Sequence, residues 1–259
     1  MKVTVFSSNQ PRHLNLVREL SKISDEIFFI SENNKAISYY KNLSKKSKII
    51  QTYLMNLISS EISIFNNTNH LPENVKTISI DTDGLDKQNN SQLDIALSSD
   101  VYIIFGASYI KGWLIDFLVK NKAINIHMGL APYYRGAACN FWAMFDNKPE
   151  YVGATIHYLS KGLDNGDILF HCLPKRQTYK NPFFFTMQPA LTAQKALVNV
   201  VKNETIFTLK SIKQDKSHEI RYSRSQDFNH IVANNFLQKN ININTNNIIY
   251  PNLIDPIFG

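Results

Sequence analysis

Short apolar segments alternate with runs of helical spacing through the first half of this 259-residue chain. Residues 2–6, 26–30, 75–80, 101–105 and 123–126 are apolar and have the length of buried strands. Helical spacing is found at 11–20, 36–65 and 113–118, and Pro11 fits the first turn of its helix. Apolar strands separated by helices are typical of a parallel sheet covered on both faces. The pattern therefore predicts an open, mostly parallel α/β sheet with helices on both faces.

The pattern changes after residue 153. Residues 153–159 and 167–173 predict two strands around a polar turn that carries Asp164. Helical spacing follows at 186–201, with Pro189 near its start, and again at 227–237. Residues 66–72 and 81–92 are polar and indicate loops, and the end of the sequence has no clear period. We expect a Rossmann-like main domain over 1–180 and a small helical or irregular C-terminal extension over 181–259.

Composition and charge narrow the class of protein. The chain is 44% hydrophobic, enough for a full core, and no run of 18 apolar residues predicts a membrane-spanning helix. The apolar run at the start, MKVTVFSSNQPRH, is too short for a signal peptide. Cys139 and Cys172 are expected to be buried thiols of a cytoplasmic protein. The net charge of +7 indicates solvated helix faces or an anionic partner, either phosphates on a small substrate or nucleic acid.

Polar side chains gather where the predicted strands end. Ligands of open parallel sheets bind beyond the carboxyl ends of the strands, so these side chains are expected to share one cleft. They are Ser7, Ser8, Asn9, Gln10 and Arg12 after the first strand, residues 106–110 after the fourth, and Asn125 and His127 at the end of the fifth. Residues 8–10 could equally form an ordinary helix N-cap, and His127 taken alone could be a satisfied buried histidine.

Asn125, His127 and Asp164 together indicate acyl transfer without a covalent intermediate. An amide donor stabilises an oxyanion, an imidazole handles the proton, and a carboxylate raises the pKa of that imidazole and orients it. Asp167, three residues further on, is a second carboxylate, and its expected role is to cap the turn before the next strand.

The segments NIHMGLAPYYRGAACNFWAMFDN and GATIHYLSKGLDNGDIL resemble the formyltransferase family. This family includes methionyl-tRNA formyltransferase, glycinamide ribonucleotide formyltransferase and the bacterial sugar N-formyltransferases. The motifs that carry the resemblance are the Asn-x-His pair, the loop with Pro132, Arg135 and Gly136, and the Leu-Asp-x-Gly turn. The resemblance implies that residues 1–180 are a formyltransferase catalytic domain in which Asn125, His127 and Asp164 are catalytic.

The resemblance also implies a donor, 10-formyl-tetrahydrofolate, held largely by backbone groups of two loops. The expected donor-binding residues are Gly106, Ser108, Tyr109, Ile110, Leu159 and Gly162. The loop that opens the first helix is expected to hold a phosphate or sugar of the acceptor, because helix N-termini attract anions. The expected acceptor-binding residues are Ser8, Asn9, Gln10, Arg12, Tyr134 and Arg135. Arg12 could instead pair with a surface carboxylate such as Glu19.

The acceptor is less constrained than the donor. Met128 and Gly129 stand where many relatives have Pro-Ser, a departure that resembles sugar N-formyltransferases acting on nucleotide-linked amino sugars for surface polysaccharide such as lipopolysaccharide O-antigen. Another amine, such as methionyl-tRNA or glycinamide ribonucleotide, and a non-catalytic folate- or nucleotide-binding module stay open as alternatives.

Other partners are weakly indicated. The basic residues Lys213, Lys216, Arg221 and Arg224 around Tyr222 are a weak sign of nucleic acid, which a solvated strand edge explains equally well. No metal is expected, because the adjacent His171 and Cys172 suit no common zinc spacing. The resemblance implies a homodimer.

Overall fold

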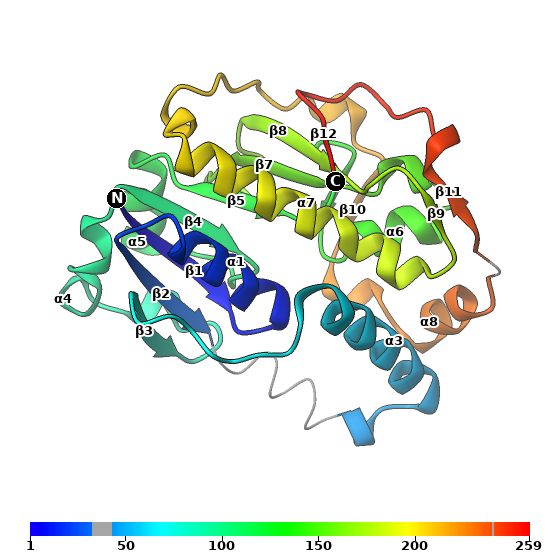
Figure 1. The fold of residues 1–259 in the computed structure, drawn as a ribbon. Coiled ribbons are helices and arrows are strands. Elements are labelled where there is room, and N and C mark those ends of the chain that lie inside the picture. The colour runs from blue at the N-terminus through cyan, green and yellow to red at the C-terminus, as the bar shows by residue number, and fades with distance from the viewer. Residues whose placement is uncertain (33–42, 240) are drawn as a thin grey trace.

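An eight-stranded sheet forms the centre of the computed structural model, which describes residues 1–32, 43–239 and 241–259 (Figure 1). Its strands are β1 (Lys2–Ser8), β2 (Glu26–Glu32), β3 (Val75–Ile80), β4 (Val101–Phe105), β5 (Ile124–His127), β7 (Ala154–Tyr158), β8 (Ile168–Leu173) and β12 (Ile257–Phe258). They lie in the order β12-β8-β7-β5-β4-β1-β2-β3. The strands from β3 to β5 are parallel, β7 is antiparallel to β5 and β8, and β12 is parallel to β8. The predicted mostly parallel sheet is confirmed.

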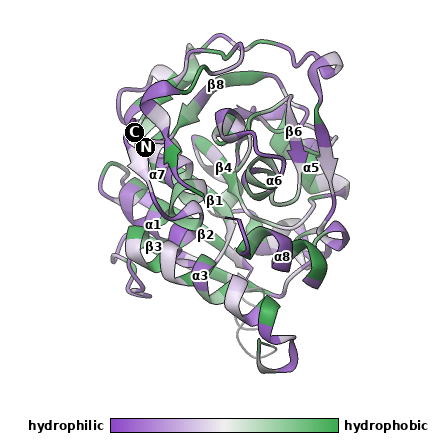
Figure 2. Cartoon of the chain, turned by 90° about the vertical axis from the view of Figure 1, so that its right-hand side faces the viewer, coloured by the Kyte–Doolittle hydropathy of each residue, from purple (hydrophilic) through white to green (hydrophobic). Residues whose placement is uncertain are grey.

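Helices cover both faces of this sheet, as the apolar pattern requires. On one face α1 (Pro11–Ser21) and α7 (Pro182–Lys202) bury Leu16, Leu20 and Leu197 against strand residues such as Val5 and Ile103. On the other face, α4 (Asn90–Leu93) and α5 (Gly112–Lys120) pack their apolar residues against β1, β2 and β4. Figure 2 shows β8 coloured as hydrophobic, which matches a strand whose six residues are all buried.

Three predicted elements have different bounds. The helical run expected at 36–65 is α3 (Lys48–Phe65), preceded by a 3-10 turn at Leu43–Lys45, and its expected start falls outside the described residues. α7 begins at Pro182 because Asn181 caps it by accepting from the backbone N–H of Phe183 and Phe184, so Pro189 lies inside the helix. The loop expected at 81–92 contains a 3-10 turn and the start of α4, because Leu85 and Leu93 bury their side chains.

A second apolar cluster joins the C-terminal part of the chain to the sheet domain. It contains α3, α6 (Cys139–Phe145), the start of α7 and α8 (His230–Leu237), which begins three residues later than expected because Asn229 caps it. Short strand pairs add to it: β6 (Tyr134–Gly136) with β10 (Arg221–Ser223), and β9 (Thr178–Tyr179) with β11 (Ile243–Asn244). Since α7 covers β8 and β12 completes the sheet, both parts share one core, and the boundary at residue 180 stays a prediction.

None of the helices in the described ranges combines the length and the apolar character needed to span a bilayer.

Candidate active site

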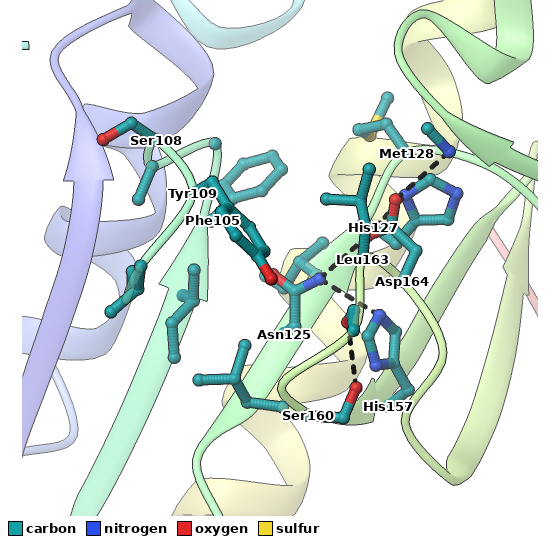
Figure 3. Close-up of a pocket in the computed structure, with 18 of the residues that line it drawn as sticks. Phe105, Ser108, Tyr109, Asn125, His127, Met128, His157, Ser160, Leu163 and Asp164 are labelled. Atoms are coloured by element: carbon teal, nitrogen blue, oxygen red, sulfur yellow. Dashed lines mark hydrogen bonds and ion pairs between the residues drawn. The ribbon is translucent and has the colours of Figure 1, made fainter. Parts of the chain in front are cut away.

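A pocket of about 300 Å³ lies beyond the carboxyl ends of β4 and β5 (Figure 3). Its walls come from residues 104–110, 125–128 and 157–164, with Arg12, His13, Ile115 and Gly136 completing the lining. The antiparallel β7 ends beside the start of β5, where Tyr158 pairs with Ile124, and the turn after it folds back towards His127. This return brings together side chains almost forty positions apart in the sequence.

Asn125, His127 and Asp164 meet in this pocket, as the motif predicts. His127 Nδ1 lies 3.4 Å from Asp164 Oδ1, and Asn125 Nδ2 lies 3.5 Å from the same oxygen. The His127 side chain is only 6% exposed and that of Asp164 10% exposed, so their interaction is weakly screened by water. The pocket therefore combines an amide donor, an imidazole and a carboxylate within reach of one another.

His157, which the sequence analysis missed, orients the Asn125 amide. It lies opposite Asn125 in the β5–β7 pairing, and its Nδ1 donates to the carbonyl oxygen of Tyr158 at 2.8 Å. Burial lowers the pKa of His157 to about 4, against an opposing effect of Asp164, so the ring is neutral at pH 7. Its Nε2 lone pair therefore accepts from Asn125 Nδ2 at 3.0 Å. A histidine within an otherwise apolar strand next to the motif was the only sequence signal for this contact.

His127 is held from both sides of its ring. Its Nε2 faces the carbonyl oxygen of Tyr134 at 3.0 Å, and because a carbonyl only accepts, this nitrogen carries a hydrogen. Gly129 permits the arrangement, since a Cβ there would lie 2.6 Å from His127 Nε2 and 2.5 Å from the Cβ of Cys139. The absence of a side chain at Gly129 therefore makes room for the imidazole of His127.

Asp164 lies on a turn with a left-handed backbone (φ 48°) that several groups hold in place. Its Oδ2 accepts from the backbone N–H of Gly136 at 3.2 Å. Arg135 donates to the carbonyl oxygen of Leu163 at 2.7 Å and pairs with Glu219 at 2.7 Å. Gln214 donates to the carbonyl oxygen of Asp164 at 3.0 Å. Arg135, expected to touch the acceptor, is thus engaged with the Asp164 turn and does not line the pocket.

The six residues expected to bind the donor all line this pocket. They are Gly106, Ser108, Tyr109, Ile110, Leu159 and Gly162. Gly106 has a left-handed backbone (φ 68°) and packs directly on the ring of His13, which leaves no room for a side chain. The Tyr109 hydroxyl donates to the carbonyl oxygen of Lys161 at 2.6 Å, which joins the loop after β4 to the turn after β7 across the pocket.

The residues expected to bind the acceptor are more scattered. Ser8 is buried and its hydroxyl contacts His13 Nδ1 at 3.0 Å, and Asn9 and Gln10 line neither this pocket nor its neighbour. The Tyr134 hydroxyl donates to Asp146 at 3.0 Å, away from the pocket. Of the six, Arg12 alone lines the site, and its partner is Glu61, at 2.7 Å, rather than the suggested Glu19.

A second cavity of about 520 Å³ adjoins the first, and Arg12 and Met128 line both. Its other walls include the rings of Tyr53, Phe141 and Phe228, which contact one another with centroids 4.7 to 5.5 Å apart. Sequence reasoning missed this cavity because its walls come from α3, α6, the start of α7 and the segment before α8, which only the tertiary fold brings together.

No arrangement of three or more His, Cys, Asp or Glu side chains suited to a metal ion is found within residues 1–32, 43–239 and 241–259. His171 is engaged on both ring nitrogens, with the carbonyl oxygen of Ala131 at 2.8 Å and the backbone N–H of Ile254 at 2.9 Å.

Comparison with known proteins agrees with this geometry. A family model described as formyl transferase matches residues 1–175. A methionyl-tRNA formyltransferase of Anaeromyxobacter dehalogenans is 39% identical over 74 residues, which are 29% of this chain and 23% of that protein. The match thus spans about a quarter of the length of that relative.

Two solved structures show the same fold at low sequence identity. A 4-N formyltransferase from Francisella tularensis has a TM-score of 0.55 and 18% identity, over 87% of this chain and 77% of the other. A sugar N-formyltransferase from a Shewanella species has a TM-score of 0.50 and 21% identity, over 88% and 78%. At these identities the similarity establishes the fold alone.

Proposed function

Because the chain belongs to the formyl transferase family, we propose that it transfers the formyl group of 10-formyl-tetrahydrofolate to the amine of a nucleotide-linked amino sugar. The observation that carries this proposal is the meeting of Asn125, His127 and Asp164 in a pocket at the edge of the sheet. We expect the protein to act in the cytoplasm, in synthesis of surface polysaccharide, and as a homodimer.

The donor fits the pocket that the two loops enclose. A volume of about 300 Å³ is at the lower end of the range for small-molecule sites. Residues 106–110 and 159–162 supply backbone groups around an apolar interior, which suits a flat heterocycle with polar edges. When bound, the donor supplies an electrophilic formyl carbon.

The three side chains then have separate tasks. One amide hydrogen of Asn125 is committed to His157, whereas the other faces Asp164 at 3.5 Å, where a hydrogen bond is weak. This second hydrogen is available to an oxygen that gains negative charge in the pocket. The adjacent His127 and Asp164 form an acid–base pair that takes the proton lost by the attacking amine.

The second cavity supports a nucleotide-linked acceptor. Its aromatic walls suit a nucleobase, since every base offers a face for stacking. Arg12 borders both cavities and donates one side-chain hydrogen bond to Glu61, which leaves further guanidinium N–H groups for phosphates between the sugar and the base. Met128 also borders both cavities, so the acceptor's sugar would reach the catalytic side chains there.

The proposal is tested with purified protein, 10-formyl-tetrahydrofolate and a panel of amines. Nucleotide-linked amino sugars should yield N-formyl sugars by mass spectrometry, with stoichiometric formation of tetrahydrofolate. Turnover with methionyl-tRNA or glycinamide ribonucleotide alone would support formyl transfer and would contradict the amino-sugar acceptor. Absence of turnover with every amine would contradict an enzyme and would favour a non-catalytic folate- or nucleotide-binding module.

Substitutions test the roles of the three catalytic side chains. Asn125→Ala, His127→Asn and Asp164→Asn should each lower kcat ~100-fold or more with donor affinity nearly unchanged, because they act in the transition state. Combined substitutions should be far from additive. Asp167→Asn, at the next carboxylate along the turn, is the matched control and should retain activity. More than about half of the activity in Asp164→Asn would contradict its assigned role.

A separate substitution tests the aromatic cavity. Phe228→Ala should raise the acceptor KM about 10-fold, within the range of ~1–3 kcal/mol for one stacking contact, with kcat and donor KM unchanged. Phe207→Ala removes an exposed ring away from both cavities and is the control. An unchanged acceptor KM in Phe228→Ala would place the nucleobase elsewhere.

A further inference from the structure

Glu32, the last residue of β2, carries a fully buried carboxylate. In the register of the sheet it lies between Ser8 of β1 and Ile80 of β3, at the edge where the pocket opens. None of the ion pairs found in the described parts of the chain includes it. A buried carboxylate of this kind is costly unless hydrogen bonds replace its water.

The donors that replace this water come from two loops. Glu32 Oε2 accepts from the backbone N–H of Ser108 at 2.6 Å, and Oε1 accepts from the Ser108 hydroxyl. Oε1 also accepts from the backbone N–H of Asp83 at 2.9 Å. Because three hydrogen bonds from two loops converge on this one carboxyl group, it anchors both loops.

Ser108 lies in the middle of the loop after β4, whose residues 106–110 form one wall of the pocket. Glu32 itself does not line that pocket, and it binds the loop through Ser108 from outside the pocket. On its other side the loop is fixed by the Tyr109–Lys161 hydrogen bond. The backbone conformation of this wall is therefore fixed without a ligand, and it depends on the side chain of Glu32, which belongs to a different strand.

We propose that Glu32 is a positioning residue for the formyl donor. Its carboxylate holds the loop 106–110 in the shape that binds the donor's heterocycle, and it touches neither the donor nor the catalytic side chains. The inference rests on the proposed function, since it takes the same pocket as the donor site. It assigns donor affinity to a carboxylate outside the Asn-x-His and Leu-Asp-x-Gly motifs.

Glu32→Gln is the informative substitution because it keeps the size of the side chain. A carboxylate only accepts, whereas an amide has one oxygen and one NH2 group. The Ser108 hydroxyl can reverse its bond, but the backbone N–H groups of Ser108 and Asp83 bind different oxygens, so the amide satisfies only one of them. Ser108→Ala is the milder variant, which removes the hydroxyl and keeps the backbone bond. Glu26→Gln is the matched control, because the partly exposed Glu26 lies at the other end of β2 and pairs with Lys76.

Two measurements decide the proposal. The first is the affinity for a stable reduced folate by titration calorimetry, together with the donor KM and kcat. Glu32→Gln should raise the donor Kd and KM about 10-fold with kcat and acceptor KM nearly unchanged. Ser108→Ala should raise the donor Kd and KM by a smaller factor. In a protein that already carries Ser108→Ala, adding Glu32→Gln should raise them less than it does in the wild type, since the two groups act as a pair. Glu26→Gln should match the wild type.

The second measurement is backbone hydrogen exchange without ligand, which tests the anchoring independently of the donor. Faster exchange over 106–110 in Glu32→Gln than in Glu26→Gln is expected. Equal donor affinity in both variants, or faster exchange confined to the Asp83 loop, overturns the proposal. If Glu32→Gln does not fold, unchanged donor affinity in Ser108→Ala overturns it. A wild-type protein that binds no reduced folate refutes the proposed function, and with it the donor role of Glu32, whatever the exchange data show.

Discussion

Lowering the pH from 7 to 5 should destabilise the protein through the buried imidazole of His157. Burial lowers the pKa of His157 to about 4 in the folded protein, whereas the unfolded chain has a value of about 6.5. Between these values the unfolded chain binds a proton that the folded protein does not. The free energy of unfolding therefore falls as the pH drops below about 6.5, and this loss ends near pH 4.

The size of the effect follows from the same two values. At pH 5 the unfolded imidazole is about 1.5 pH units below its pKa, and each unit corresponds to about 1.4 kcal/mol. The loss attributable to His157 is then about 2 kcal/mol at pH 5 and close to zero at pH 7. His171, whose pKa burial also lowers, changes stability in the same direction and is present in every variant compared.

Urea unfolding at pH 7 and pH 5, at constant ionic strength, measures this term by difference. His157→Gln keeps an acceptor for Asn125 and removes the titrating group, so its loss of stability should be about 2 kcal/mol smaller than that of the wild type. His70→Gln, in an exposed loop, controls for the loss of a histidine from the chain and should follow the wild type. Equal pH dependence in the wild type and His157→Gln would refute the assignment of a neutral ring to the folded protein.

Two further substitutions test contacts around the pocket. Gly129→Ala should cost about 1–3 kcal/mol of stability by thermal unfolding and should lower kcat, because the added Cβ meets the Cys139 side chain and His127; a variant with wild-type stability and activity would show that the loop yields freely. Tyr109→Phe removes the hydroxyl bond to Lys161 and should speed both association and dissociation of the donor in stopped-flow experiments; unchanged rates would show that this bond does not control entry to the pocket.

The sequence predicts best what depends on local pattern. The strands β1 to β5, β7 and β8 follow from short apolar runs, and the meeting of Asn125 with His127 follows from their spacing at a strand end. The short strand β6 was not predicted. Asp164 lies on the turn between β7 and β8, the two strands that were predicted around it. In contrast, the partner of Arg12 could not be read from the sequence, because α3 comes against α1 only in the tertiary fold.

Contacts over long sequence separations explain the remaining differences. His157 and Glu32 are ordinary polar residues in apolar strands until the fold brings donors to them. The donor to His157 is the Asn125 amide of the neighbouring strand, and those to Glu32 come from the loops after β3 and β4. The aromatic cavity likewise combines α3 with the segment before α8. Such sites depend on packing between distant segments, which neither hydrophobic period nor motif spacing encodes.

Residues beyond 210 hold the turn that carries Asp164. The family pattern ends at residue 175, yet Gln214 and Glu219 reach back to the turn, the latter through Arg135. Part of the support of this turn therefore lies outside the region that the family model matches. Residues 1–175 alone would keep Asn125, His127 and Asp164 but would lack the hydrogen bond from Gln214 and the partner of Arg135. A substitution at Gln214 or Glu219 can therefore shift the Asp164 carboxylate, although both residues lie about fifty positions further along the chain.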